Sequence, residues 1–309
     1  IFEKYINQKA FGAYYTRPQI TEYLCDRTIN KLIVDRVNTA LSDKYQPFED
    51  INDLLIKQDG NVCRLLVEEI IPNLSILDPA CGSGAFLIAA LKTLISVYSA
   101  AIGTIKLQGD ARNKKWLREI ENQHKSLTYY IKKRIVTDNL YGVDIMEEAT
   151  EIAKLRLFLA LVASVDNVDE LEPLPNIDFN IMAGNSLIGL IKVDETAFDC
   201  VGNSKQGNLL KPLKAANYKK ILEDKNQSIE LYKKHAFQSG EEHGTSQDSR
   251  LLMLKKHIEK LNQESQVKLN NLLLDEFNNL KIKYEQKQLT GKAKKRPLTA
   301  DDIQALKPF

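Results

Sequence analysis

The chain has 309 residues, enough for one large domain or two smaller ones, and its 43% hydrophobic and 27% charged residues are ordinary values for a globular protein. No apolar run approaches the roughly 18 to 20 residues of a membrane span. The first residues also lack the basic start and apolar block of a signal peptide. We therefore expect no membrane association and a cytoplasmic location.

The cysteine and charge patterns indicate the state of the thiols and the possible partners of the protein. The four cysteines form no CxxC pair, which favours reduced thiols over disulfides or zinc, so we expect no metal site. They are Cys25, Cys63, Cys81 and Cys200. Residues 1–202 carry 22 Lys+Arg and 28 Asp+Glu (net −6), whereas residues 203–309 carry 21 and 13 (net +8). The basic part is expected near a polyanion if its charges share a face; a solvated, lysine-rich helical surface is the alternative.

The first 72 residues are predicted to be mainly helical. Apolar spacing predicts a helix over residues 19–41, with Pro18 suited to its first turn. A loop with a short helix over 42–60 and a helix over 62–71 follow. The absence of an initiator Met leads us to expect that the numbering begins inside a longer gene product.

Residues 73–202 are predicted to form an α/β domain. The predicted strands are residues 75–77, 140–143 and 179–182. The helices between them are expected over 85–99, 108–134 (a polar excursion) and 147–165. Strands alternating with helices are typical of a parallel sheet with helices on its faces.

Residues 203–309 are predicted to be a helical insertion. A polar linker, 203–213, precedes helical patterns over 214–237 and 249–287. The apolar residues of the second pattern recur at steps of three and four, which is typical of helix packing. We therefore predict a basic helical hairpin.

The stretch "ILDPACGSGAFLIAAL" (76–91) is an apolar strand, an acid, a Gly-Ser-Gly turn and an apolar helix. A parallel strand brings its last residues to the edge of the sheet where ligands bind, and glycines there allow a ligand to approach the backbone. The following helix offers free N–H groups. The turn lacks the full G-x-G-x-x-G and the P-loop Lys, so an NTPase is unsupported, and a purely structural turn is the alternative.

Two further strand ends carry polar residues. Asp144 follows the second strand, where a carboxylate can bind the two hydroxyls of a ribose. Gly184, Asn185 and Ser186 follow the third strand and could touch a base. An acid, a second acid and an amide at successive strand ends predict a pocket for an amino-acid-bearing nucleoside, S-adenosylmethionine.

Four motifs resemble those of the gamma-ordered N6-adenine DNA methyltransferases. "DPACGSGAF" (78–86) resembles motif I, and "FGAYYTRPQITEYL" (11–24) resembles motif X. "LYGVDIMEEATEIAKLRLFLAL" (140–161) resembles motif II with its helix, and "IMAGNSLIG" (181–189) resembles motif III. Together they look like the methyltransferase part of a type IIG restriction-modification enzyme. The resemblance implies a Rossmann-like S-adenosylmethionine-dependent methyltransferase sheet, with a helical N-terminal segment and a helical insertion.

The resemblance also implies roles for residues that hold the methionine part of the cofactor. Thr16 and the adjacent backbone would hold the carboxylate. Asp78, with the backbone near Ala80 and Gly82, would hold the amino end. The alternative for Thr16 is that it only begins a helix and binds no ligand.

Other residues would hold the adenosine. Asp144 would bind the ribose hydroxyls, and Ile145 would pack on the adenine. Asn185 would lie at the adenine N6, with Ser186 nearby. Many relatives have Asp at the position of Asn185, but an amide oxygen can still accept a hydrogen bond from N6.

The catalytic tetrapeptide of the family, Asn/Asp-Pro-Pro-Tyr/Phe, is missing, because no Pro-Pro pair occurs in the sequence. In the family its oxygens accept the protons of the target amino group and its ring stacks on the flipped base. We therefore assign no catalytic residue. The chain is expected to be an N-terminal piece of a longer enzyme, to bind double-stranded DNA through parts largely outside this chain, and not to methylate alone.

Several alternatives remain open. The cofactor fold could serve RNA or a protein amide instead of DNA, or could be a non-catalytic scaffold in a phage-defence complex. Glu285-Gln286-Lys287 matches half of a nuclease motif, and we interpret it as a chance match within a helix. The basic stretch "GKAKKRP" (291–297) could touch DNA phosphates or be a solvated linker.

Overall fold

The computed structural model groups the chain into two compact units, Ile1–Ala183 and Gly184–Phe309. It describes residues 16–42, 45–108, 111–165, 175, 177–188, 214–238, 245–286 and 294–308. We call Ile1–Ala183 unit 1 and Gly184–Phe309 unit 2 and describe each by itself. The division into 1–72, 73–202 and 203–309 stays a prediction.

Unit 1 begins with the predicted helical segment. Its helices are α2 (Pro18–Cys25), α3 (Lys31–Ala40), α4 (Ile51–Lys57) and α5 (Gly60–Arg64). A π-helical turn joins α2 to α3, so one nearly continuous helix runs from Pro18 to Ala40, as predicted. Pro18 occupies the first helical position, where its missing N–H group has no helical partner to lose. A second π-helical turn extends α5 through Ile70 and confirms the helix predicted there.

The sheet of unit 1 is parallel and has the predicted strands. They are β1 (Ile76–Asp78), β2 (Leu140–Asp144) and β3 (Ile181–Ala183), in the order β1-β2-β3. Asp78 lies opposite Gly142, and Asp144 lies opposite Ala183. Because the strands are parallel, their carboxyl ends lie at one edge of the sheet.

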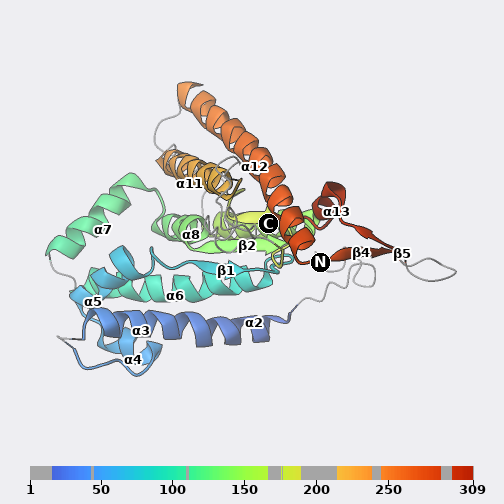
Figure 1. The fold of residues 1–309 in the computed structure, drawn as a ribbon. Coiled ribbons are helices and arrows are strands. Elements are labelled where there is room, and N and C mark those ends of the chain that lie inside the picture. The colour runs from blue at the N-terminus through green and yellow to red at the C-terminus, as the bar shows by residue number, and fades with distance from the viewer. Residues whose placement is uncertain are drawn as a thin grey trace. The chain divides into compact units, whose positions relative to one another are not determined.

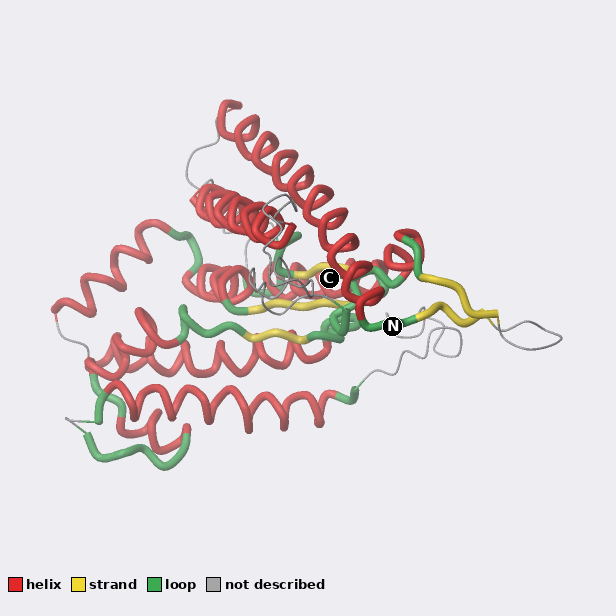
Figure 2. Tube along the Cα trace, viewed as in Figure 1, coloured by secondary structure: helices red, strands yellow, loops and turns green. Residues whose placement is uncertain are grey.

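Helices connect and cover these strands (Figure 1). They are α6 (Ala85–Gln108), α7 (Ala111–Gln123), α8 (Leu127–Asp138) and α9 (Glu147–Val162). Helix α6 packs on β1 and β2, whereas α9 packs on β2 and β3. The predicted polar excursion is the pair α7 and α8, and Figure 2 shows the same alternation of helix and strand along the chain. Unit 1 is thus a mainly helical domain with a small parallel sheet, consistent with an α/β methyltransferase fold.

Helix α6 is more extensive and more apolar than predicted. It continues to Gln108, and by length and composition alone it could cross a membrane. The expectation that no apolar segment is long enough to span a membrane is therefore wrong for this helix. Half of the apolar window is buried in the protein, and α6 packs against α2, α5, α8 and the sheet. Its apolar character is accounted for by its place in the core of unit 1.

Two buried asparagines tie the strands of unit 1 to the preceding segments. Asn139, just before β2, donates from Nδ2 to the carbonyls of Ile71 (2.6 Å) and Leu74 (2.7 Å). Asn180, just before β3, donates from Nδ2 to the carbonyls of Thr137 (2.8 Å) and Leu140 (3.0 Å). Each amide thus binds backbone carbonyls near the start of the neighbouring strand. These hydrogen bonds help to fix the register of the strands.

Unit 2 contains the predicted helical hairpin and a strand pair that was not predicted. Its elements are α11 (Lys214–Gln238), α12 (Thr245–Asn279), β4 (Lys283–Gln286), β5 (Lys294–Pro297) and α13 (Ala300–Ala305). Helices α11 and α12 pack along each other. A small core joins them to α13 and contains Tyr218, Leu269, Leu272, Leu273 and Ile303. The predicted linker 203–213 lies outside the described residues.

The helix predicted through residue 287 is wrong beyond Asn279. Lys281 adopts φ +57°, and Ile282 N–H donates to the Phe277 carbonyl (2.9 Å), which closes the helix end. Strand β4 then pairs with β5 in antiparallel orientation. Glu285 and Gln286 of the half-motif therefore lie in β4, and Lys294–Pro297 of the "GKAKKRP" stretch form β5, whereas Lys287 lies outside the described residues.

We predict that Asn139→Ala lowers the free energy of unfolding by about 2–4 kcal/mol, because two carbonyl groups lose their buried donor. Chemical denaturation of the full chain would measure this change. Asn73→Ala is the matched control, because the exposed Asn73 amide also donates to a carbonyl, that of Glu69. The control should change stability by less than about 0.5 kcal/mol. Equal losses in both variants would show that burial of the Asn139 bonds does not matter.

Candidate cofactor-binding site

The Gly-Ser-Gly turn between β1 and α6 has a conformation that requires glycine. Gly82 has φ +49° and Gly84 has φ +80°, a region that other residues rarely adopt. Cys81 N–H donates to the Val143 carbonyl (2.9 Å), so the turn is tied to β2. Gly84 N–H donates to the Cys81 carbonyl (2.8 Å) and closes the turn.

Helix α9 supports the turn from one side. Arg156 Nη1 donates to the Ser83 carbonyl (2.9 Å) and to Ser83 Oγ (3.0 Å), and Ser83 is completely buried. A Cβ on Gly84 would lie 3.1 Å from the Cβ of Ala153. Neither Ala153 nor Arg156 was predicted to belong to the site. The sequence gives only one indication of their role, which is that both lie in the helix that resembles the helix of motif II.

Gly142, in the middle of β2, lets the turn pack closely on the sheet. A Cβ there would lie 3.0 Å from both Cys81 Sγ and Leu87 Cδ1. The buried Cys81 thus fills the space above Gly142, which agrees with a packing role for this cysteine. Burial raises the pKa of the Cys81 thiol to about 12, so it stays protonated.

Asp144 lies at the end of β2, as predicted, and is hydrogen-bonded to the Gly-Ser-Gly turn. Gly82 N–H donates to Asp144 Oδ2 (2.9 Å), and Met146 N–H donates to Oδ1 (2.9 Å). A carboxylate has about four lone-pair sites, so each oxygen can accept a further hydrogen bond. The structure therefore brings two predicted residues, Gly82 and Asp144, into direct contact and leaves the carboxylate able to accept hydroxyl groups.

Asp78 lies beside this pair with one oxygen unsatisfied. Ala80 N–H donates to Asp78 Oδ1 (3.1 Å), whereas Oδ2 is buried and has no hydrogen-bond partner among the described residues. Burial raises the pKa of the Asp78 carboxyl, and the negative charge of Asp144 raises it further. Asp78 lies opposite Gly142, two residues before Asp144, so the two acids are expected on the same face of the sheet. A cationic or N–H donor would satisfy the buried oxygen.

Two predicted residues of unit 1 lie around these acids in the chain. Ile145 follows Asp144 directly and is 51% exposed, so its side chain is accessible to a ligand. Thr16 is half-buried and lies two residues before α2. Helices α2 and α6 pack together and begin at the same end of unit 1 (Figure 1). A contact of Thr16 with a ligand stays a prediction.

Asn185 and Ser186 belong to unit 2. Asn185 Oδ1 accepts from Leu187 N–H (3.1 Å), while its own N–H donates to the Lys307 carbonyl (2.8 Å). Ser186 is exposed. Their approach to the adenine of a cofactor stays a prediction.

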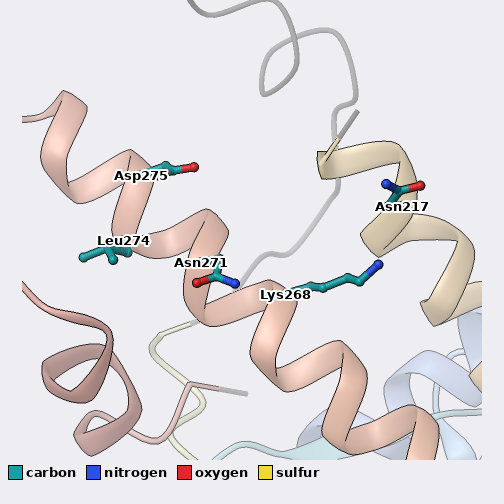
Figure 3. Close-up of a pocket in the computed structure, with 5 residues that line it drawn as sticks. All are labelled: Asn217, Lys268, Asn271, Leu274 and Asp275. Carbon is teal, nitrogen blue, oxygen red and sulfur yellow. The ribbon is translucent and has the colours of Figure 1, made fainter. Parts of the chain in front are cut away.

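Unit 2 also has a groove of about 200 Å³ between its long helices (Figure 3). It is lined by Asn217, Lys268, Asn271, Leu274 and Asp275. None of the residues predicted to bind a cofactor lines this groove. Asn217, Asn271 and Asp275 are exposed, so the groove is a wide surface depression and a weaker candidate for a ligand site than the turn of unit 1.

A parallel sheet with an acid and a glycine turn at its carboxyl edge is the arrangement of an α/β cofactor-binding domain. Residues 57–187 match the family described as "MmeI, DNA-methyltransferase domain". This range contains all the predicted cofactor-binding residues except Thr16.

Three relatives are similar to parts of the chain. A Methanocaldococcus jannaschii protein named as a type II restriction enzyme and methyltransferase, RM.MjaORFECS2P, is 36% identical over 211 residues, which cover 62% of this chain and 16% of that protein. The type II restriction enzyme and methyltransferase RM.Eco57I of Escherichia coli is 34% identical over 38% of this chain and 11% of its own length. DNA methyltransferase A of Bacillus subtilis is 27% identical over 43% of this chain and 12% of its own length.

Residues 57–187 therefore match an MmeI-type DNA-methyltransferase domain, and the chain is similar to parts of type II restriction enzyme and methyltransferase proteins. It aligns with less than a fifth of the length of each of these relatives.

We predict that Gly84→Ala lowers the free energy of unfolding by about 1–3 kcal/mol, because alanine at φ +80° is strained and its Cβ would press on Ala153. Thermal or chemical unfolding would measure the change. Gly103→Ala is the matched control, because this glycine lies within α6 and a Cβ there meets nothing within 4 Å. Alanine at position 103 should instead stabilise the helix by about 0.5–1 kcal/mol. A neutral Gly84→Ala variant would contradict the described turn.

We also predict that Asp78→Asn stabilises the ligand-free protein near pH 7. A carboxyl whose pKa is raised on folding favours the folded state when protonated, and this advantage is lost as pH rises through the folded-state pKa. The gap in melting temperature between variant and wild type should therefore widen from pH 4 toward pH 7 in buffered thermal scans. Asp138→Asn is the control, because Asp138 pairs with Arg134 (3.4 Å) and its replacement should not stabilise the fold. A melting temperature of Asp78→Asn below wild type at pH 7 would refute this prediction.

Proposed function

We propose that this chain is the S-adenosylmethionine-binding part of a site-specific DNA adenine-N6 methyltransferase of a restriction-modification system. The observation that carries the proposal is the buried, unsatisfied Oδ2 of Asp78 beside the Gly82–Asp144 contact. Similarity to methyltransferases of restriction-modification enzymes supports it.

The charges and shapes at the turn fit the methionine end of the cofactor. Asp78 would accept a hydrogen bond from the ammonium group, which supplies the missing partner and a compensating positive charge. The backbone at Ala80 and Gly82 would line the approach, since Gly82 has no side chain to block it. Thr16 would bind the carboxylate.

The neighbouring strand end fits the adenosine. Asp144 would accept the ribose hydroxyls with the lone pairs that the Gly82 and Met146 amides leave available. The exposed Ile145 would lose apolar surface to water when it packs on the adenine. Asn185, with Ser186 nearby, would face the adenine N6, within a Rossmann-like sheet.

The transfer step is proposed for a longer parent enzyme in the cytoplasm. Bound cofactor supplies an electrophilic methyl group, and the parent would direct it to a flipped adenine of double-stranded DNA. The family's Pro-Pro tetrapeptide is missing from these 309 residues. We therefore propose that this chain holds the cofactor without methylating DNA alone. The same absence favours a second candidate, a non-catalytic methyltransferase-like scaffold in a phage-defence complex.

Isothermal titration calorimetry of the full chain with S-adenosylmethionine tests the proposal. We expect measurable binding that Asp78→Asn or Asp144→Ala weakens by about tenfold or more, because each variant removes a charge-assisted hydrogen bond. Binding should also weaken as pH falls through the raised pKa of Asp78, since the neutral acid is a poor partner for an ammonium group.

Asp138→Asn is the matched control, because this carboxylate lies just before β2, at the opposite end of that strand from Asp144. It should leave the affinity unchanged. Circular dichroism would verify that every variant remains folded. The assignment fails if Asp78→Asn and Asp144→Ala bind the cofactor as tightly as the control does.

A further inference from the structure

The segment around the strand pair of unit 2 is rich in positive charge. Within residues 281–297, the described residues carry five Lys+Arg and one Glu, a net charge of +4, which is half of the +8 of residues 203–309. Within this range, β4 and β5 form an antiparallel ribbon in which Lys283 lies opposite Pro297 and Gln286 lies opposite Lys294. The described part of this range is therefore an ordered basic element. We call the pair β4 and β5 the hairpin arm.

Three lysines of the hairpin arm and its base face solvent. Lys281, Lys283 and Lys295 are all exposed. Lys281 lies at the end of α12 with φ +57°, so the chain turns sharply there before the ribbon begins. Lys283 and Lys295 lie on one face of the ribbon, where Lys295 is opposite Glu285, so this face has a net positive charge that would attract a polyanion.

Arg296 has a different role, because it fixes the base of the hairpin arm. Its Nη1 and Nη2 donate to Oδ2 and Oδ1 of Asp302, both at 2.6 Å. Asp302 also accepts from Thr299 N–H (2.8 Å) as part of the cap of α13. The hydrogen bonds from Arg296 and Thr299 hold the pKa of Asp302 well below its usual value, so the pair persists at neutral pH. The end of β5 is thus joined to α13 by a two-pronged contact that orients the ribbon.

We propose that the hairpin arm, together with Lys281 at its base, is a DNA-binding element in which Lys281, Lys283 and Lys295 contact phosphates of duplex DNA. The major groove of DNA, about 12 Å wide, admits a two-stranded ribbon, and lysines gain affinity by displacing condensed counterions from phosphates. The major groove of an RNA duplex is deep and narrow and admits no such ribbon. The proposal rests on the proposed function for DNA as the partner. Residues 287–293 lie outside the described residues and carry no part of it.

Fluorescence anisotropy of the full chain with a labelled DNA duplex, over a series of salt concentrations, tests the proposal. The arm variant is K281E/K283E/K295E. The matched control is K220E/K256E/K260E, which changes the net charge equally at exposed lysines of α11 and α12. We expect the arm variant to lose about 100-fold or more in affinity and its log–log salt slope to fall by about 3, since each phosphate contact contributes about 0.9. The control should lose less than about threefold, because exposed lysines away from the DNA act only through screened, long-range charge.

Several outcomes would overturn the proposal. It fails if both triple variants weaken binding equally, or if the arm variant binds DNA as well as wild type. It also fails if an RNA duplex or phosphatidylserine vesicles bind more tightly than DNA through the same lysines. The milder K281Q/K283Q/K295Q variant provides a second measurement if the glutamate variant does not fold, and should show a smaller loss in the same direction.

Calorimetry with S-adenosylmethionine separates this proposal from the preceding one. The arm variants should bind the cofactor as wild type does, because none of the three lysines belongs to the cofactor site. Binding of DNA through the hairpin arm without any cofactor binding would refute the proposed function alone. Cofactor binding without arm-dependent DNA binding would refute the hairpin proposal alone.

Discussion

The hydrogen bond from Gly82 N–H to Asp144 Oδ2 is the contact on which the candidate site depends. It joins the turn after β1 to the end of β2, segments 62 residues apart in the sequence. The bond can form because Gly82 and Gly84 adopt positive φ and because Gly142 leaves room for Cys81 above the sheet. Arg156 secures the same turn from α9 through Ser83. The two acids are consequently held at one edge of the sheet before any ligand arrives.

Pre-organisation has an energetic consequence at Asp78. Its carboxyl group is removed from water and lies near a second acid, so its pKa is raised and ionisation opposes folding. A purely structural turn would be more stable with an amide or an apolar residue at this position. A buried acid that destabilises the free protein is instead expected where a cation binds, because the ligand supplies the charge that the fold withholds. This conflict between folding and binding is the main physical argument for a ligand at this turn.

Sequence patterns could predict the parts of the structure that depend on local chemistry. The strands at Ile76, Leu140 and Ile181 are short apolar runs, and the glycines of the Gly-Ser-Gly stretch mark a turn between a strand and a helix, so both were predicted correctly. Support from Arg156 and from the Asn139 and Asn180 amides depends on tertiary contacts that no local pattern reveals. The hairpin arm was missed because its strands are lysine-rich and lack apolar alternation, so helical periodicity from α12 was extended too far. The predicted roles of Thr16, Asn185 and Ser186 need a ligand complex and stay predictions.

The central claim is that burial raises the pKa of the Asp78 carboxyl and that a cationic ligand beside it lowers this pKa again. Carbon-13 NMR of the Asp78 carboxyl through a pH titration, with and without S-adenosylmethionine, tests this claim most directly. The account predicts a raised pKa in the free chain and a clear decrease when the cofactor is bound. An Asp78 pKa that is the same in the two titrations, with the cofactor shown to be bound, would contradict the account.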